Sequence, residues 1–296
     1  MTFGKLKKKR GHFMKIRVSS DSTCDLSPEL VQQYDIQIIP LYIIKGGQPY
    51  KDTLEICPQD IFDWFDAGNG VCSTSAVNEA DYIDAFQSLR RDCDALIHFT
   101  ISSEMSACYT NACLAAEEIP GVYVIDSRNL STGIGHLVLD AARMAREGVM
   151  TAEEIVRVIE DETAKVESSF IIDKLDYLAK GGRCSSLAAF GANLLNLKPC
   201  IEVIDGKMSV GKKYRGSFEK VIVQYVRDRL KSRDDIDPRR IFITYARGVS
   251  REIADKVEAE LRSIVPFDTV YHTYAGCTIS NHCGPVCLGI LFFRSR

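Results

Sequence analysis

Short apolar runs alternate with helical patterns along the first half of the chain. The apolar runs predict strands at 16–18, 36–44, 95–100 and 121–126. The segments between and after them predict helices at 28–34, 58–65, 78–90, 104–118, 134–147 and 152–165. Strands that alternate with helices in this way lie parallel in one sheet, and the helices cover its two faces. We therefore expect an N-terminal α/β/α domain with a parallel sheet.

The second half of the chain has a different order of predicted strands and helices. Strands are predicted at 170–172, 199–204, 208–214, 240–245, 269–274 and 286–293, and helices at 175–178, 186–196, 217–231 and 250–264. Asp205-Gly206, between two of these strands, is a strong signal for a two-residue hairpin. The sequence thus predicts a C-terminal α/β domain with a mixed or antiparallel sheet. We divide the chain into a basic tail at 1–13, an N-terminal domain at 14–165 and a C-terminal domain at 166–296.

Charge and composition argue against nucleic-acid and membrane partners. The 296 residues carry a net charge of only -3, so no strong field attracts nucleic acid or an anionic membrane. The basic run 5–10 precedes Met14 and lacks the apolar segment of a signal peptide, which indicates either a solvated tail or an early start codon. No apolar run reaches the length of a membrane span, so we expect no stable membrane insertion and a cytoplasmic location.

The eleven cysteines are expected to be reduced thiols. Their number is odd, the chain is long, and no secretory signal accompanies them. The pairs Cys283/Cys287 and Cys108/Cys113 lack the two-residue spacing of a zinc or redox motif. We expect no metal and no cofactor.

Three hydroxyl-rich loops, at 19–26, 72–75 and 101–107, each stand where an apolar run ends. The first and third follow predicted strands, and open α/β sheets bind ligands at the carboxyl edge of their strands. Helix N-termini there offer free N–H groups and a positive dipole end, and hydroxyls add directional hydrogen bonds. The sequence therefore predicts a site for a small anionic group at this edge.

Several of these polar residues also have simpler structural explanations. Ser27 and Ser102 are expected to cap helices, which is the commonest role of serine at a strand-to-helix turn. Asp21 and Asp25 fit a structural turn as well as they fit hydrogen bonds that position a nearby hydroxyl.

Short motifs are spread over nearly the whole chain from Met14 onward. They are Ser20-Asp21-Ser22-Thr23-Cys24-Asp25-Leu26, Thr74-Ser75, Ile101-Ser102-Ser103 with Ser106 and Tyr109, Ile125-Asp126-Ser127, Gly182-Arg183, Leu197-Lys198-Pro199, Arg215 and His282-Cys283-Gly284-Pro285. Any one of them is weak evidence. As a set, in this order and spacing, they resemble the DegV family.

The resemblance implies a bacterial fatty-acid-binding protein with two α/β domains, a ligand tunnel between them and an acyl-chain pocket in the C-terminal domain. It also implies a partner, a separate ATP-dependent fatty-acid kinase that converts the bound carboxylate to an acyl phosphate. Thr74 and Ser106 match carboxylate-binding hydroxyls of the family, and His282 matches the histidine near the head group. Ser75 and Ser103 belong to the same motifs and are expected to contact the ligand. Arg215 matches a basic position associated with head-group exchange or kinase docking.

The chain departs from the family pattern beside each head-group motif. Ala76 stands where glutamine is expected, and Ala107 and Val286 each stand where glycine is expected. These changes leave the expected fold intact and bear on which ligand and which chain length the site accepts.

The segment 187–195 is apolar almost all round and is a candidate wall of the tunnel. A buried helix packed on the second sheet explains the same pattern, and we prefer that interpretation. The two are compatible, because core side chains line a tunnel.

Two other functions are compatible with parts of the sequence. An acyl-ester hydrolase would use Ser106 as nucleophile and His282 as base, but the chain has no Gly-x-Ser-x-Gly elbow and no assignable third carboxylate. A phosphotransfer domain of the dihydroxyacetone-kinase type would need nucleotide or phosphohistidine machinery, and no P-loop or convincing kinase motif occurs.

Overall fold

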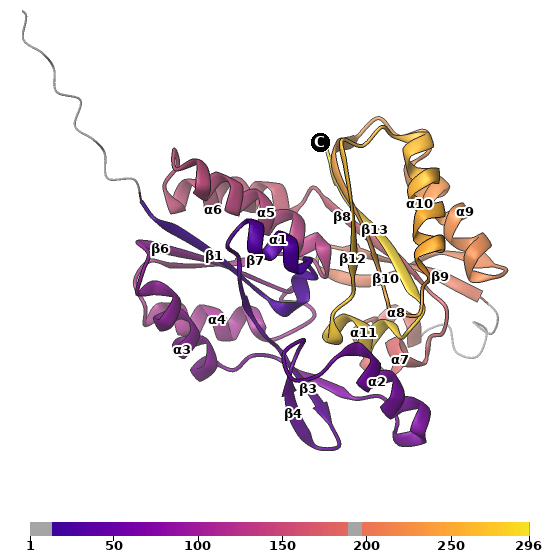
Figure 1. Ribbon diagram of the computed structural model, residues 1–296, viewed down its shortest axis with the longest axis horizontal. Coiled ribbons are helices and arrows are strands. Elements are labelled where there is room, and N and C mark those ends of the chain that lie inside the picture. The colour runs from indigo at the N-terminus through magenta and orange to yellow at the C-terminus, as the bar shows by residue number, and fades with distance from the viewer. Residues whose placement is uncertain (1–13, 189–196, 296) are drawn as a thin grey trace, which may run out of the picture.

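A four-stranded parallel sheet forms the centre of the N-terminal half of the protein (Figure 1). The structure is a computed structural model and describes residues 14–188 and 197–295. The sheet has the order β2-β1-β6-β7 and consists of β1 (Ile16–Asp21), β2 (Gln37–Ile39), β6 (Ala95–Thr100) and β7 (Val122–Asp126). Its pairings are all parallel, so the carboxyl ends of β1 and β6 lie side by side, as predicted.

Helices cover both faces of this sheet. α5 (Thr132–Glu147) and α6 (Ala152–Thr163) pack on one face, and α3 (Glu79–Arg90) and α4 (Cys108–Glu117) pack on the other. β6 is buried along its whole length because both of its faces are covered. The short α1 (Pro28–Gln33) begins at the expected N-cap, since the Ser27 hydroxyl accepts a hydrogen bond from Leu30 N at 3.4 Å.

A six-stranded mixed sheet dominates the second half. Its order is β10-β9-β8-β13-β11-β12, and its strands are β8 (Val166–Ile172), β9 (Leu197–Ile204), β10 (Lys207–Arg215), β11 (Ile236–Tyr245), β12 (Thr269–Tyr274) and β13 (Cys287–Arg294). Only the β11–β12 pair among these is parallel, and β9 and β10 form the predicted hairpin around Asp205-Gly206. The predicted α/β fold with a parallel and a mixed sheet is confirmed. The boundary proposed at 165 falls between α6 and β8, and the division into domains stays a prediction.

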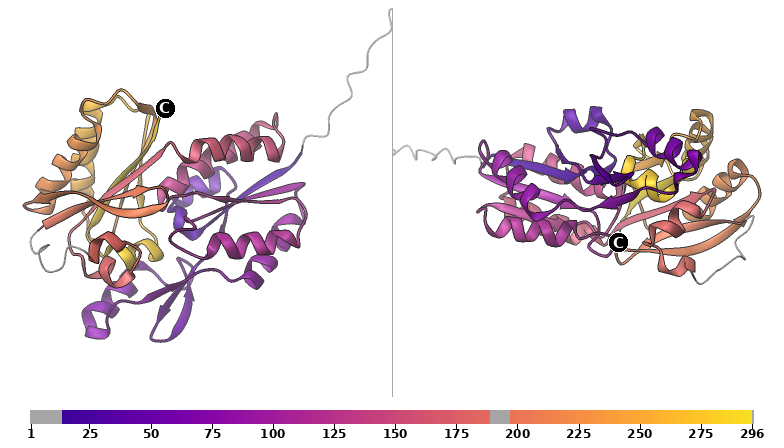
Figure 2. Two further views of the ribbon diagram at one scale, coloured as in Figure 1. Left: turned by 180° about the vertical axis from the view of Figure 1, so that it is seen from behind. Right: turned by 90° about the horizontal axis from the view of Figure 1, so that it is seen from below.

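The second sheet uses its two faces differently. Along β11, Ile241 and Ile243 belong to a core under α9 (Phe218–Leu230) and α10 (Arg251–Ile264), whereas Phe242 belongs to the core shared with the first sheet. This alternation follows from the two-residue period of a strand. Figure 2 shows α9 and α10 on the outer side of the second sheet and the rest of the protein on its inner side.

A third, small antiparallel sheet corrects one prediction. The segment 36–44, expected as one strand, forms β2 and then β3 (Tyr42–Lys45), which belongs to a separate sheet with β4 (Gln48–Lys51) and β5 (Ser73–Ser75). Pro40 stands at the break, because proline has no N–H for a ladder hydrogen bond. Between β4 and β5 the chain forms α2 (Pro58–Trp64) and the turn η2 (Phe65–Asn69).

Three short helices lie near this small sheet and the second sheet: α7 (Asp176–Gly181), α8 (Ser185–Ala188) and α11 (Cys277–Cys283). α11 has no counterpart among the predicted helices, because its buried residues include the polar Thr278, Ser280 and Asn281 and so show no amphipathic pattern. Most of the predicted helix 186–196 and of the candidate tunnel wall 187–195 lies outside the described residues.

The loop after β6 corrects two further predictions. α4 begins at Cys108 rather than at residue 104, so Ser102 does not cap it. Instead, the Ser102 hydroxyl donates a hydrogen bond to Gly206 O at 2.7 Å and thereby ties the first sheet to the β9–β10 hairpin. Within the described ranges, no helix is long and apolar enough to cross a membrane.

The buried hydroxyl of Tyr225 provides a test of the second core. It donates to Ser169 O at 2.6 Å and accepts from Ile290 N at 3.2 Å. We expect Tyr225→Phe to lower the free energy of unfolding by about 1–3 kcal/mol, because it leaves buried backbone groups without a partner. Urea denaturation measures the change. Tyr50→Phe, on the small sheet, is the control and should change stability by less than about 0.5 kcal/mol; equal losses in both variants would contradict the assignment.

Candidate functional site

A largely apolar pocket opens where the first sheet, the small sheet and α11 meet. The empty space within it, including the open solvent at its mouth, is about 550 Å³. It is lined by Leu41, Thr74, Ser75, Ala76, Ile101, Met105, Ser106, Leu130, Arg183, Met208, Thr278, Ile279, His282 and Cys283. We call this space the head-group pocket because four residues with a predicted role in binding an anionic group line it, namely Thr74, Ser75, Ser106 and His282.

Thr74 and His282 meet in this pocket although 208 residues separate them. Thr74 Oγ1 lies 3.0 Å from His282 Nε2, at hydrogen-bond distance. Pairing of Thr74 with Ile43 in the small sheet holds the threonine, and the last turn of α11 carries the histidine. A Cβ on Gly181 would lie only 2.2 Å from His282 Nδ1, so the ring occupies space that a glycine leaves free.

The imidazole of His282 is neutral at neutral pH. Burial, and to a lesser extent the positive charge of Arg183, lowers the pKa of His282 to about 4. Nδ1 is buried and has no hydrogen-bond partner among the described residues. The ring therefore contributes to the pocket as a hydrogen-bonding group and not as a cation.

Ser106 stands at the start of α4. Its hydroxyl donates to Cys108 Sγ at 3.2 Å and accepts from Cys108 N at 3.3 Å. The first N–H groups of a helix have no partner within the helix, and they carry the positive end of its dipole. Ser106 thus gives this wall of the pocket a hydroxyl that can donate a hydrogen bond to an anion, beside the positive end of α4.

The other two predicted hydroxyls lie in different surroundings. Ser75 lines the pocket, is exposed, and donates to Ala76 O at 3.2 Å. Ser103 lies outside the lining; its N–H donates to Asp126 Oδ1 at 3.1 Å, and its hydroxyl accepts from Arg128 at 3.3 Å. The structure therefore brings together four of the predicted site residues, namely Thr74, Ser75, Ser106 and His282.

Arg215 also lies outside the lining. It is exposed at the end of β10, paired with Leu197 of β9. The ligand-binding roles of Ser103 and Arg215 stay predictions.

Arg183 is a pocket residue that the sequence analysis did not assign to the site. It is exposed, it is the one cation among the described lining residues, and it donates through Nη1 to Gly181 O at 2.8 Å and through Nε to Met105 O at 3.4 Å. The signal was available in the Gly181-Gly182-Arg183 sequence, where Gly182 takes a left-handed φ of 69° and ends α7. A guanidinium here can pair with an anion at the pocket mouth.

A second, narrower cavity lies beside the head-group pocket. Its empty space is about 330 Å³, and it shares Leu130, Ile279 and Cys283 with the first pocket. The rest of its wall comes largely from the inner face of the second sheet, including Phe170 and Leu291. The polar pocket thus adjoins a mostly apolar space, an arrangement that suits a molecule with an anionic head and an apolar tail.

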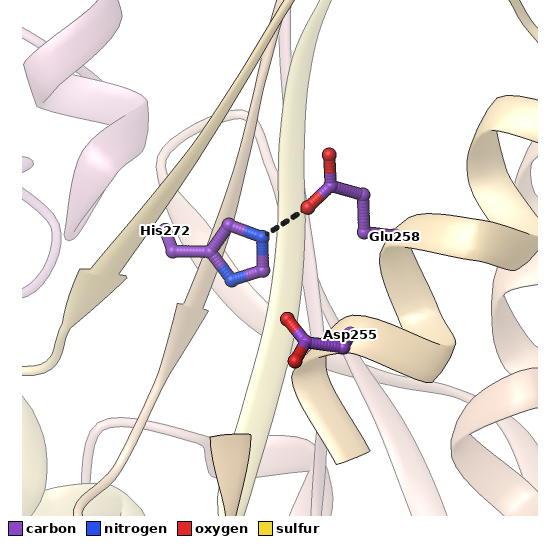
Figure 3. Close-up of side chains that lie close together, drawn as sticks. All are labelled: Asp255, Glu258 and His272. Carbon is purple, nitrogen blue, oxygen red and sulfur yellow. Dashed lines mark hydrogen bonds and ion pairs between the residues drawn. The ribbon is translucent and has the colours of Figure 1, made fainter. Parts of the chain in front are cut away.

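One cluster away from the pocket contains metal-binding residue types. Asp255 and Glu258 of α10 approach His272 of β12 (Figure 3). Each carboxylate already has a cationic partner, since Arg251 lies 2.7 Å from Asp255 and Arg262 lies 2.8 Å from Glu258. His272 Nε2 lies 2.6 Å from Glu258. These contacts favour an ion-pair cluster over a metal site, and the expectation of no metal stays a prediction.

The buried state of His282 leads to a pH prediction. Its ring nitrogens should titrate with a midpoint below pH 5, measured by NMR of the imidazole, because burial disfavours the charged form. The unfolded chain binds this proton with a pKa of about 6.5, so the folded protein should lose stability as the pH falls from there toward 4. A midpoint near 6.5 would contradict the buried, neutral assignment.

Comparisons with known proteins agree with this architecture. A family model described as "Uncharacterised protein, DegV family" matches residues 15–295. A DegV domain-containing protein of Caldanaerobacter subterraneus is 31% identical over 281 residues, which cover 94% of this chain and 98% of that protein. A protein of Thermotoga maritima named fatty acid-binding protein is 31% identical over 212 residues, which cover 69% of this chain and 72% of that protein.

A solved structure has the same fold. It is a DegV family protein from Thermus thermophilus, described by its fatty acid binding, and it superposes with a TM-score of 0.84 at 28% identity. The match covers 95% of this chain and 100% of the other. Both the family model and these relatives span nearly all or most of the sequence, and we conclude that the chain belongs to the DegV family.

Proposed function

We propose that this protein binds a long-chain fatty acid, with the carboxylate in the head-group pocket and the hydrocarbon chain in the adjoining apolar cavity. The observation that carries this proposal is the meeting of Thr74, Ser106, His282 and Arg183 around one pocket whose remaining wall is mostly apolar. The fatty-acid binding described for the Thermus thermophilus and Thermotoga maritima relatives supports it.

The hydrocarbon chain would supply most of the affinity. Burial of a methylene contributes about 0.8 kcal/mol, so roughly fifteen methylenes contribute on the order of 12 kcal/mol before the cost of ordering the chain. Met105 and Met208 at the head-group pocket are flexible side chains that can adjust to an apolar ligand. The head group then needs only enough hydrogen bonds to replace the water that it loses.

Hydroxyls and one guanidinium suit a carboxylate that must remain accessible. A buried carboxylate is costly unless donors replace its hydration. Thr74 and Ser106 can each donate one hydrogen bond, and Arg183 can add a charge-assisted contact. Since Arg183 and Ser75 are exposed, this end of the pocket faces solvent and a partner protein can reach it.

We further propose that a separate fatty-acid kinase phosphorylates the carboxylate to an acyl phosphate while this protein holds the chain. The protein would then act as a carrier without turnover of its own. The exposed Arg215 lies on the second sheet away from the pocket lining, which suits contact with the kinase better than contact with the ligand. A cytoplasmic location fits the need for ATP and the free state of all eleven cysteines.

The alternative function, hydrolysis of an acyl ester, has weaker support from the geometry. His282 Nε2 is at hydrogen-bond distance from Thr74, and the described contacts of the Ser106 hydroxyl are with Cys108. His282 Nδ1 has no carboxylate partner among the described residues, whereas a catalytic histidine is oriented by one. Turnover of acyl esters that disappears in Ser106→Ala would favour the hydrolase.

The head-group assignment predicts a loss of affinity in the double variant Thr74→Ala/Ser106→Ala. Each hydrogen bond to a charged group contributes about 1.5–3 kcal/mol, so we expect fatty-acid affinity to fall by about a hundredfold or more. Competition with a fluorescent fatty acid measures this change. Ser263→Ala, an exposed serine on α10, is the matched control and should leave the affinity unchanged.

Mass spectrometry of lipid extracted from the purified wild-type protein identifies the ligand independently. A stoichiometric fatty acid supports the proposal. A protein that stays empty after incubation with a panel of fatty acids, or a double variant with wild-type affinity, would contradict it.

Arg215→Ala should separate docking from binding. We expect fatty-acid affinity to change less than twofold and kinase-dependent formation of acyl phosphate to fall at least tenfold, because the side chain lies outside the pocket lining. Arg251→Ala on α10 is a control of the same charge change. Equal loss of binding and phosphorylation in Arg215→Ala would instead place this residue in ligand retention or folding.

A further inference from the structure

Two buried aspartate side chains from the first 52 residues hold the start of α11. Asp52, which is fully buried, accepts hydrogen bonds from Cys277 N at 2.9 Å, from Thr278 N at 3.1 Å and from Thr278 Oγ1 at 2.7 Å. Asp25 accepts from Gly276 N at 2.8 Å. Three successive backbone N–H groups thus donate hydrogen bonds to these two side chains.

These side chains act as hydrogen-bond acceptors for the backbone N–H groups at the start of α11. The leading N–H groups of α11 have no acceptor within the helix, and the oxygens of Asp25 and Asp52 supply one for each of them. α11 has only seven residues, and a helix of that length does not hold its shape without external contacts. The hydrogen bonds to Asp25 and Asp52 therefore fix the position of α11.

The same carboxylates are tied to the loops of the first sheet. Asp52 also accepts from the Ser22 hydroxyl at 3.0 Å, and Asp25 accepts from the Ser131 hydroxyl at 2.6 Å. Burial raises the pKa of Asp25 to about 8, while the hydrogen bonds from Ser131 and Gly276 oppose that rise, so at neutral pH Asp25 is largely a neutral carboxyl whose oxygens still accept hydrogen bonds. Burial of the Asp25 and Asp52 side chains costs free energy. The hydrogen-bond donors that these side chains accept from belong to α11 or to the loops at the edge of the first sheet.

Most of α11 borders the head-group pocket. Thr278 and Ile279 line the pocket near the start of the helix, and His282 and Cys283 line it at the other end. Asn281 adds one contact near this end, since its side chain donates to Cys72 O at 2.9 Å, next to the strand that holds Thr74. A shift at the start of the helix would therefore displace both His282 and the wall shared by the two cavities.

We infer that Asp52 and Asp25 are positioning residues, which fix α11 so that His282 meets Thr74 and the pocket keeps its shape for the ligand. Neither residue belongs to the lining of the pocket; both act through the helix. The consequence for ligand affinity rests on the proposed function, whereas the consequence for His282 is independent of it.

Asp52→Asn is the first test, because it keeps the shape of the side chain and replaces one acceptor oxygen by a donor. We expect fatty-acid affinity to fall at least tenfold through faster dissociation. In the ligand-free protein, the NMR midpoint of His282 should rise from about 4 toward the ordinary value, because the ring becomes more hydrated. The ring of His98, whose pKa burial lowers to about 3 in the first sheet, should not change and is the internal control.

Milder variants guard against loss of folding. Thr278→Val removes one donor to Asp52 and keeps the size of the side chain, and Gly276→Ala places a Cβ 2.9 Å from Asp25 Oδ1. Both should shift the His282 signal in the direction of Asp52→Asn, by a smaller amount. Asp92→Asn, an exposed residue just before β6, is the charge-matched control and should change neither quantity.

The outcomes separate the two proposals. A wild-type His282 signal in folded Asp52→Asn and Thr278→Val would overturn the positioning role. If the wild-type protein binds no fatty acid but these variants still shift His282, the positioning role is supported and the proposed ligand is wrong. A shift of His98 together with His282 would indicate general loosening of the protein and would also overturn the specific role of Asp52.

Discussion

The attachment of α11 to the buried carboxylates Asp25 and Asp52 is the interaction on which the pocket depends. It joins a helix near the C-terminus to loops near the N-terminus across more than 200 residues. The hydrogen bonds offset the cost of burying the polar carboxyl groups of Asp25 and Asp52, and the oxygens of these groups satisfy the free N–H groups of the helix. His282 reaches Thr74 only because this helix is placed between the two halves of the protein.

The candidate site has a polar part and an apolar part. Thr74, Ser106 and His282 provide neutral hydrogen-bonding groups, and Arg183 provides one exposed positive charge. The neighbouring cavity along Phe170 and Leu291 is mostly apolar. In the function proposed above, such a division would let an apolar tail determine affinity while the head group remains near solvent.

The elements with strong local signals were predictable. The strand β6, the hairpin at Asp205-Gly206 and the N-cap Ser27 follow from apolar runs, turn residues and capping preferences that act over a few residues. The break at Pro40 was visible in the sequence, yet the apolar residues on both sides made a single strand look more favourable. Here the missing N–H of proline outweighed the apolar pattern.

The candidate site was predictable only in part. The resemblance to the DegV family pointed to Thr74, Ser106 and His282, and the structure places all three around one pocket. Arg183 and Asp52 were not assigned, because neither shows in the sequence which distant group it faces. The roles of Arg183 and Asp52 depend on contacts with parts of the chain that lie far away in sequence.

The sequence by itself determined the alternation of strands and helices, the parallel and mixed sheets, and the family. Those properties arise from periodicity and from short motifs, which local interactions can specify. Only the tertiary structure decided that α11 exists as a helix, that buried carboxylates hold it, and that His282 stays neutral beside Thr74. The physical reason is that burial and long-range hydrogen bonds set these properties, and neither is defined until the two halves of the chain pack together.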